Sequence, residues 1–76
     1  MSDLRLRWAE SLRVHREAAG LTQAELAKAI GSTQQRISAW EGGLTTPRDE
    51  TRLRLASALG CPVYDLFSYP EAGAAA

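Results

Sequence analysis

Two short helical patterns separated by one glycine occupy the middle of this 76-residue chain, in the segment TQAELAKAIGSTQQRISAWE at residues 22–41. Thr22 stands three residues before Glu25, a spacing in which each side chain can cap the other residue's backbone N–H at a helix start. The apolar residues that follow share one helical face: Leu26, Ala27 and Ile30. Gly31 ends the pattern, so a short amphipathic helix is predicted over about residues 23–30.

A second helical pattern follows at about residues 34–41, and Ser32 or Thr33 supplies its N-cap hydroxyl. Ile37 and Trp40 make a single apolar flank, which leaves the rest of this helix polar or small. The polar or small residues that surround this flank are Gln34, Gln35, Arg36, Ser38 and Ala39. Because a side-chain amide can pair with N6 and N7 of adenine, the pattern predicts a helix that presents amides to base edges.

This pair of helices and the sequence around it resemble the DNA-binding domain of the Cro and phage-repressor family, the XRE-like helix-turn-helix proteins. The likeness covers about residues 8–67. The residues that carry it are Arg16, Gly20-Leu21-Thr22-Gln23, Glu41-Gly42-Gly43, Pro47, Leu55-Ala56, Leu59-Gly60 and Leu66-Phe67. The resemblance implies an all-α fold, a compact five-helix domain of the phage-repressor type with its helix-turn-helix at the second and third helices.

A supporting first helix is expected to begin at Ser2 or Asp3 and to end at Gly20. Its apolar positions recur at helical spacing: Leu4, Trp8, Leu12 and Ala19. By size the chain makes one domain, expected over residues 1–69, and residues 70–76 form a small, Ala-rich stretch that is expected to be a flexible tail.

A fourth helix is expected to start at Thr46 and Pro47, because Asp49 and Glu50 then stand in its first turn, and to stop at Gly60. A short fifth helix is expected to begin at Cys61-Pro62. The residues that these two helices turn inward are expected to be Leu55, Ala56 and Leu59, then Val63, Leu66 and Phe67.

Composition excludes several classes of function. The single cysteine, Cys61, permits no internal disulfide and fits a reducing compartment, and with His15 as the only histidine the chain has no zinc set. No apolar run approaches the length of a membrane span, and the start lacks a signal peptide's apolar middle. No catalytic motif or phosphate-cradling glycine loop is present. We therefore expect a cytoplasmic protein that is no enzyme, needs no cofactor or metal and has no membrane partner.

Net charge supports DNA binding only through its distribution, because nine basic residues balance nine acidic ones. Residues 1–48 hold seven basic and five acidic residues, and residues 49–76 hold two basic and four acidic ones. This polarity predicts that one face turns toward phosphate and another away from it, with modest affinity per subunit.

Specific contacts with DNA are expected from the position of the motif. The residues expected to read bases are Gln34, Gln35, Arg36, Ser38 and Ala39, with Gln35 the favoured reader. The residues expected at phosphates are Gln23, Thr33, Trp40, Thr45, Thr46 and Arg48. Arg36 is placed to reach either a guanine or a phosphate, and Trp40 is expected to lie half in the core.

The resemblance also implies a structural ion pair between Arg16 of the first helix and Glu41 at the end of the reading helix. Two positions depart from the family pattern. His15 stands where these domains commonly have an apolar residue, and Arg52 stands where they commonly have a leucine. His15 is expected to be a satisfied, partly buried histidine. Arg52 is expected either to extend over the edge of the core or to meet an acidic residue of a second subunit.

The function predicted is a sequence-specific regulator of transcription, a repressor of bacterial or phage type that binds a double-stranded, inverted-repeat operator and lies close enough to contact RNA polymerase. A protein-interaction module, such as an antitoxin or coactivator domain, is the alternative. The balanced charge favours this alternative slightly, whereas the glutamine pair favours the regulator. A homodimer is expected, because one helix in one groove makes few contacts. Its surface is expected at the C-terminal apolar residues Val63, Tyr64, Leu66, Phe67 and Tyr69.

Overall fold

The computed structural model describes residues 3–68, and within them the chain forms five α-helices and no β-strand. The helices are α1 (Asp3–Ala18), α2 (Gln23–Ile30), α3 (Gln34–Glu41), α4 (Asp49–Leu59) and α5 (Val63–Leu66). The predicted all-α fold and the predicted bounds of α2 and α3 are confirmed. Of the helices described, none is long and apolar enough to cross a membrane.

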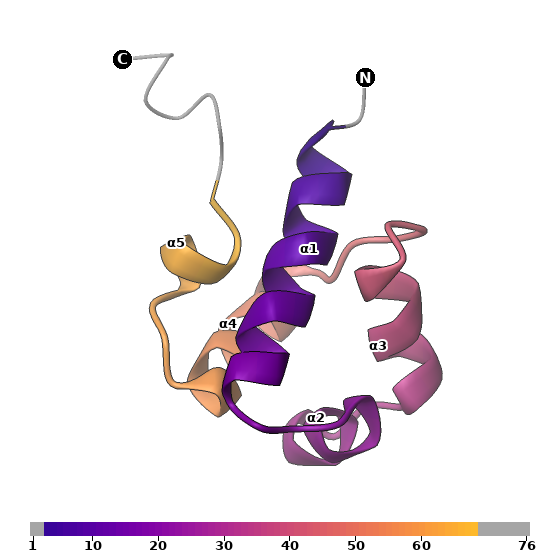
Figure 1. Ribbon diagram of the computed structural model, residues 1–76, viewed down its shortest axis with the longest axis vertical. Helices are drawn as coiled ribbons and strands as arrows, with labels where there is room; N and C mark the ends of the chain where they lie inside the picture. The colour runs from indigo at the N-terminus through magenta and orange to yellow at the C-terminus, as the bar shows by residue number, and fades with distance from the viewer. Residues whose placement is uncertain (1–2, 69–76) are drawn as a thin grey trace.

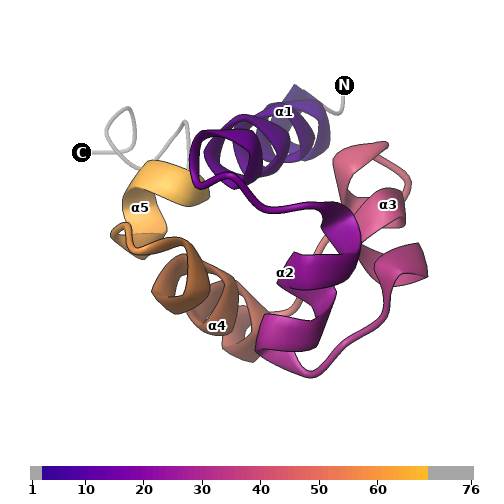
Figure 2. The same cartoon turned by 60° about the horizontal axis from the view of Figure 1, so that its bottom comes forward.

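The helices close a ring around one core. Each packs on two neighbours, in the order α1, α3, α2, α4, α5 and back to α1. Figure 1 shows α1 running through the middle of the molecule, with α3 on one side and α5 on the other. Viewed from the end that carries α2, the five helices surround a common centre, as Figure 2 shows. This arrangement leaves one side of α3 free of other helices.

The core is built from apolar residues of all five helices and the residue after α5. Its buried members are Trp8, Ala9, Leu12, Leu26, Ala27, Ile30, Ile37, Trp40, Leu55, Ala56, Leu66 and Phe67. Trp8 and Phe67 meet edge to face with ring centroids 5.2 Å apart. The indole Nε1 of Trp8 donates a hydrogen bond to the backbone oxygen of Ser68 at 2.8 Å, so α1 is bonded to the chain just beyond α5.

The termini of α2 and α3 are fixed by local hydrogen bonds. The predicted capping box is confirmed: the Thr22 hydroxyl accepts from the backbone N–H of Glu25 at 3.0 Å, and Glu25 Oε1 accepts from the backbone N–H of Thr22 at 2.9 Å. Gly31 has φ +71°, a left-handed conformation that is strained for residues with a Cβ. This conformation lets the backbone N–H of Ser32 donate to the backbone oxygen of Ala27 at 2.8 Å. Thr33, rather than Ser32, then caps α3.

Two helix boundaries differ from those expected. The helix α1 ends at Ala18, so Ala19 lies in the turn, is exposed and does not join the core; Ala9 is buried in its place. The start of α4 was expected at Thr46 and Pro47, and this was wrong: α4 begins at Asp49. Pro47 is instead buried in the preceding extended segment, where its fixed φ suits a non-helical backbone.

The proposed C-terminal dimer surface needs a correction as well. Phe67 is only 1% exposed and Leu66 is fully buried, so both belong to the core of the subunit and neither can face a second subunit. Val63 is partly buried and Tyr64 is 68% exposed. The expectation for Tyr69 falls outside the described residues. A four-residue helix shows too little periodicity for the sequence to separate its buried side from its exposed side.

Candidate nucleic-acid interface

The helix α3 turns one side into the core and presents the other outward. Ile37 and Trp40 are buried, as expected from their spacing. The side chains of Gln34, Gln35, Arg36 and Ser38 are exposed, and Ala39 is half-buried. The five residues expected to read bases thus surround the apolar flank, and none of them is used to hold the core together.

An open groove of about 750 Å³ lies between α3, the α3–α4 loop and the first turn of α4. It is lined by Thr33, Gln35, Arg36, Ala39, Trp40, Thr45, Thr46, Pro47, Arg48, Glu50 and Thr51. We call it the α3–α4 groove. It brings together most of the residues expected at bases and phosphates, which come from two stretches of the sequence, residues 33–40 and 45–48. Gln23, Gln34 and Ser38 are not among its lining residues.

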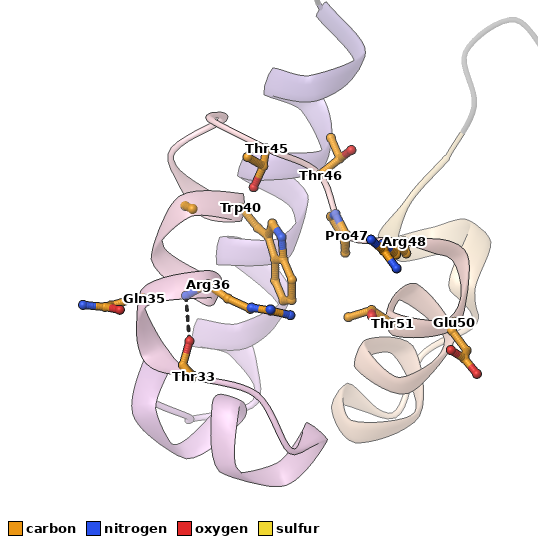
Figure 3. A pocket seen from close by; sticks show the side chains of 11 residues that line it. Thr33, Gln35, Arg36, Trp40, Thr45, Thr46, Pro47, Arg48, Glu50 and Thr51 are labelled. Atoms are coloured by element: carbon orange, nitrogen blue, oxygen red, sulfur yellow. Dashed lines mark hydrogen bonds between the residues drawn. The ribbon is translucent and has the colours of Figure 1, made fainter.

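The neighbouring residues Gln35 and Arg36 point in different directions. Figure 3 shows Gln35 extending outward from α3, whereas Arg36 reaches across the groove toward Thr51 of α4. The indole of Trp40 forms part of the groove wall while most of its surface is buried. The geometry therefore separates an outward amide from a guanidinium that faces α4.

A buried ion pair joins α1 to the end of α3. Arg16 Nε donates to Glu41 Oε2 at 2.6 Å and Arg16 Nη2 donates to Glu41 Oε1 at 3.1 Å. The two side chains are 12% and 4% exposed. Arg16 Nη1 also donates to the backbone oxygen of Leu21 at 2.8 Å. The hydrogen bond with Glu41 raises the pKa of Arg16, against a smaller opposing effect of burial, so this guanidinium stays charged.

The structure connects Gln23 to this ion pair. Its side-chain Nε2 donates to Glu41 Oε1 at 3.0 Å, and the residue is half-buried. Sequence reasoning placed this amide at a DNA phosphate and missed its bond to Glu41. The spacing along the chain offers no signal for it, because Gln23 and Glu41 belong to different helices.

The two departures from the family pattern have local partners. His15 Nδ1 lies 2.9 Å from the backbone oxygen of Ser11, as expected of a satisfied histidine. The guanidinium of Arg52 lies 4.7 Å from the centroid of the Trp8 ring, and it donates to the backbone oxygen of Pro47 at 2.9 Å and to Asp49. Arg52 therefore extends over the edge of its own core, which is the first of the two roles expected for it.

Sequence reasoning overlooked the outer face of α4. Glu50 and Thr51 line the α3–α4 groove, and Arg54 lies close by, in a smaller cavity next to it. The signal was present, since Thr51 and Arg54 have the i, i+3 spacing that puts two side chains on one helical face. Within residues 3–68, no group of three His, Cys, Asp or Glu side chains is placed to hold a metal ion.

Comparison with known proteins is consistent with this geometry. The sequence profile of the helix-turn-helix family matches residues 12–66, which is well over half of the chain. An uncharacterized HTH-type transcriptional regulator from Methanothermobacter thermautotrophicus is 44% identical over 64 residues, covering 83% of this chain and 93% of that protein.

Solved structures of transcription regulators share the fold. The restriction-modification controller protein C.AhdI from Aeromonas hydrophila has a TM-score of 0.82 at 29% identity, over 87% of this chain and 96% of that one. The clp gene regulator ClgR from C. glutamicum has a TM-score of 0.79 at 32% identity, over 96% of this chain and 94% of that one. A hypothetical transcription factor, NHTF from Neisseria, has a TM-score of 0.80 at 29% identity, over 95% of this chain and 83% of that one.

Proposed function

The chain belongs to the XRE-like helix-turn-helix family of DNA-binding transcriptional regulators, and on this premise we propose that it is a repressor that occupies an inverted-repeat operator. In this proposal α3 lies in the major groove with its first turn toward the base edges. The observation that carries it is the outward, exposed placement of Gln34, Gln35 and Ser38, opposite the buried Ile37 and Trp40.

Gln35 is the residue best placed to read a base. It extends away from the protein in Figure 3 and can use both atoms of its amide, which pair with N6 and N7 of adenine. Gln34 precedes it on the same exposed turn, and Ala39 is small enough to approach a thymine methyl group. Arg36 faces α4, and we therefore assign it to a phosphate and not to a guanine.

Phosphate contacts are proposed on both sides of α3. On one side, Thr45, Thr46 and Arg48 lie together along the α3–α4 groove and are exposed. On the other side, the first turn of α2 has free backbone N–H groups that suit a phosphate, and the Gln23 amide retains a second N–H beside its bond to Glu41. Each such contact releases counterions, so affinity is expected to fall as salt rises.

We propose that the protein binds as a homodimer through a face formed by α4 and α5. A cavity of about 220 Å³ between these helices is lined by Asp49, Arg52, Leu53, Val63, Tyr64 and Phe67. Leu53 and Tyr64 are 59% and 68% exposed, an apolar area that the subunit does not cover itself. A two-fold dimer would set the two α3 helices about 34 Å apart, one turn of DNA.

Selection of bound duplexes from a random pool tests the proposal. Enrichment of a short inverted repeat, with affinity that falls steeply with salt, is the expected result. Equal, weak binding to every duplex would contradict it. An absence of binding even at low salt would instead favour the protein-interaction module that the balanced charge suggests. Because its partner is DNA, we expect the repressor to act in the cytoplasm, where it can also contact RNA polymerase.

A further inference from the structure

A smaller cavity of about 90 Å³ lies beside the α3–α4 groove, between the α2–α3 turn, α3 and α4. It is lined by Ile30, Gly31, Ser32, Arg36, Trp40, Thr51 and Arg54. Three of these residues, Arg36, Trp40 and Thr51, line the α3–α4 groove as well, so the two spaces adjoin. A water molecule needs about 10–15 Å³, and the cavity therefore has room for a considerably larger group.

Two arginine side chains from different helices line this cavity. Within residues 3–68, neither Arg36 of α3 nor Arg54 of α4 makes an ion pair or a side-chain hydrogen bond, whereas Arg13, Arg16 and Arg52 all have carboxylate partners. Two guanidinium groups at one small cavity repel each other, and an anion between them would remove this repulsion. Glu50 lines the larger groove but not this cavity.

A buried hydroxyl group without a partner adds to the two charges. The Oγ atom of Ser32 is shielded from solvent and has no hydrogen-bond partner in the part of the chain that the structure describes. Buried hydroxyl groups are normally hydrogen-bonded, so this one lacks the partner that a ligand could supply. Because Ser32 lines the cavity, rotation about its Cα–Cβ bond would bring the hydroxyl to a ligand there. Thr51 contributes a second hydroxyl on the α4 side.

We propose that this cavity binds a phosphate group, held by Arg36 and Arg54 and by the hydroxyls of Ser32 and Thr51. A phosphate offers several oxygens around one centre, which suits two planar guanidinium groups and two hydroxyl donors that approach from different helices. The group is either a phosphodiester of the bound DNA or the phosphate of a small molecule. The assignment of this phosphate to DNA rests on the proposed function, whereas the proposal that the cavity binds a phosphate does not.

Titration of the full chain with inorganic phosphate, followed by ¹H–¹⁵N NMR at constant ionic strength, tests the site without DNA. Saturable shifts are expected at Ser32, Arg36, Thr51 and Arg54, and Arg54→Gln is expected to abolish them. Arg7→Gln is the matched control, since Arg7 is also an exposed arginine but lies on α1. Shifts that persist in Arg54→Gln, or that are lost equally in Arg7→Gln, would show unspecific ion binding and overturn the proposal.

The salt dependence of DNA affinity then separates the two sources. The slope of interest is that of log K, the association constant for DNA, against the logarithm of salt concentration. If the phosphate belongs to DNA, Arg54→Gln is expected to make this negative slope shallower by about 1, and Arg7→Gln to leave it unchanged. Saturable phosphate binding with an unchanged slope assigns the site to a small molecule. If neither the NMR titration nor the slope responds to Arg54→Gln, the proposal is wrong.

Discussion

Gln23 in the first turn of α2 and Glu41 at the end of α3 are joined by a hydrogen bond of 3.0 Å. Glu41 accepts two further bonds from Arg16, so one carboxylate connects α1, α2 and α3. Its side chain is only 4% exposed, and its charge is therefore balanced by Arg16 and not by water. One acidic residue therefore helps to hold α3 in place against α1 and α2.

Removal of Arg16 is expected to destabilise the protein strongly. Arg16→Ala leaves the Glu41 carboxylate buried without its counter-charge, which costs about 3–5 kcal/mol of unfolding free energy. Arg13→Ala is the control, because Arg13 pairs only with the exposed Glu10 and Glu17 and is expected to cost less than about 1 kcal/mol. Urea unfolding measures both. If Arg16→Ala still folds and has the same urea midpoint as Arg13→Ala, the Arg16–Glu41 pair contributes no stability.

A milder variant separates the charge from the hydrogen bonds. Glu41→Gln keeps an acceptor for Gln23 and removes the charge that Arg16 needs. We expect a loss of stability between those of Arg13→Ala and Arg16→Ala, together with weaker DNA binding, because α3 is then less firmly oriented on α1 and α2. Full operator affinity in a Glu41→Gln protein that is clearly destabilised would show that the ion pair supports folding alone.

Loss of the Gln35 amide is expected to change DNA specificity. Gln35→Ala should relax the preference at one base pair of each half-site, at a cost of about 1–3 kcal/mol, while helical content stays unchanged. Glu10→Ala on the exposed side of α1 provides the control. Sites selected by the variant and by the parent are compared, and identical sites would exclude Gln35 as a base reader.

Substitutions at the α4–α5 face are expected to separate assembly from folding. Tyr64→Asp places a charge on exposed apolar surface, so it should weaken the dimer and leave the subunit folded. Val14→Asp, an exposed apolar position on α1, is the control, and sedimentation with and without operator DNA is the measurement. Phe67→Ser should instead unfold the subunit, since Phe67 packs against Trp8 in the core. An unchanged dimer in Tyr64→Asp would exclude this face.

The thiol of Cys61 is expected to make stability fall at alkaline pH. Burial raises the pKa of this thiol, and the negative charge of Asp65 raises it further. The folded state then holds its proton at pH values where the unfolded chain has already lost it, so unfolding is favoured as pH rises above the ordinary thiol value of about 8.5. Urea midpoints of the parent and of Cys61→Ser are compared at about pH 7.5 and about pH 9.5. A parent that loses no more stability than Cys61→Ser contradicts the prediction.

The features that the sequence predicted correctly are those set by residues close together in the chain. The Thr22–Glu25 capping box, the stop at Gly31 and the buried flank of Ile37 and Trp40 all follow from spacings of four residues or fewer. The start of α4 was misplaced because proline suits a first helical turn and an extended approach to it equally well.

Features that depend on packing between distant segments were harder to predict. The burial of Phe67 depends on Trp8, which lies near the other end of the sequence, and the Gln23–Glu41 bond joins two helices. The cavity at Arg54 requires α4 to lie beside the α2–α3 turn, which helical periodicity alone does not reveal.

The contact between Trp8 and Phe67 shows that the folding unit extends beyond the residues matched by the family's sequence profile. The sequence profile matches residues 12–66, so both aromatic rings lie outside the match, as does the backbone oxygen of Ser68 that accepts a hydrogen bond from the Trp8 indole. A fragment trimmed to residues 12–66 would uncover Leu12 and Leu66, both of which are fully buried in the intact fold. We therefore expect a fragment cut at these limits to be less stable than a chain that retains Trp8, Phe67 and Ser68.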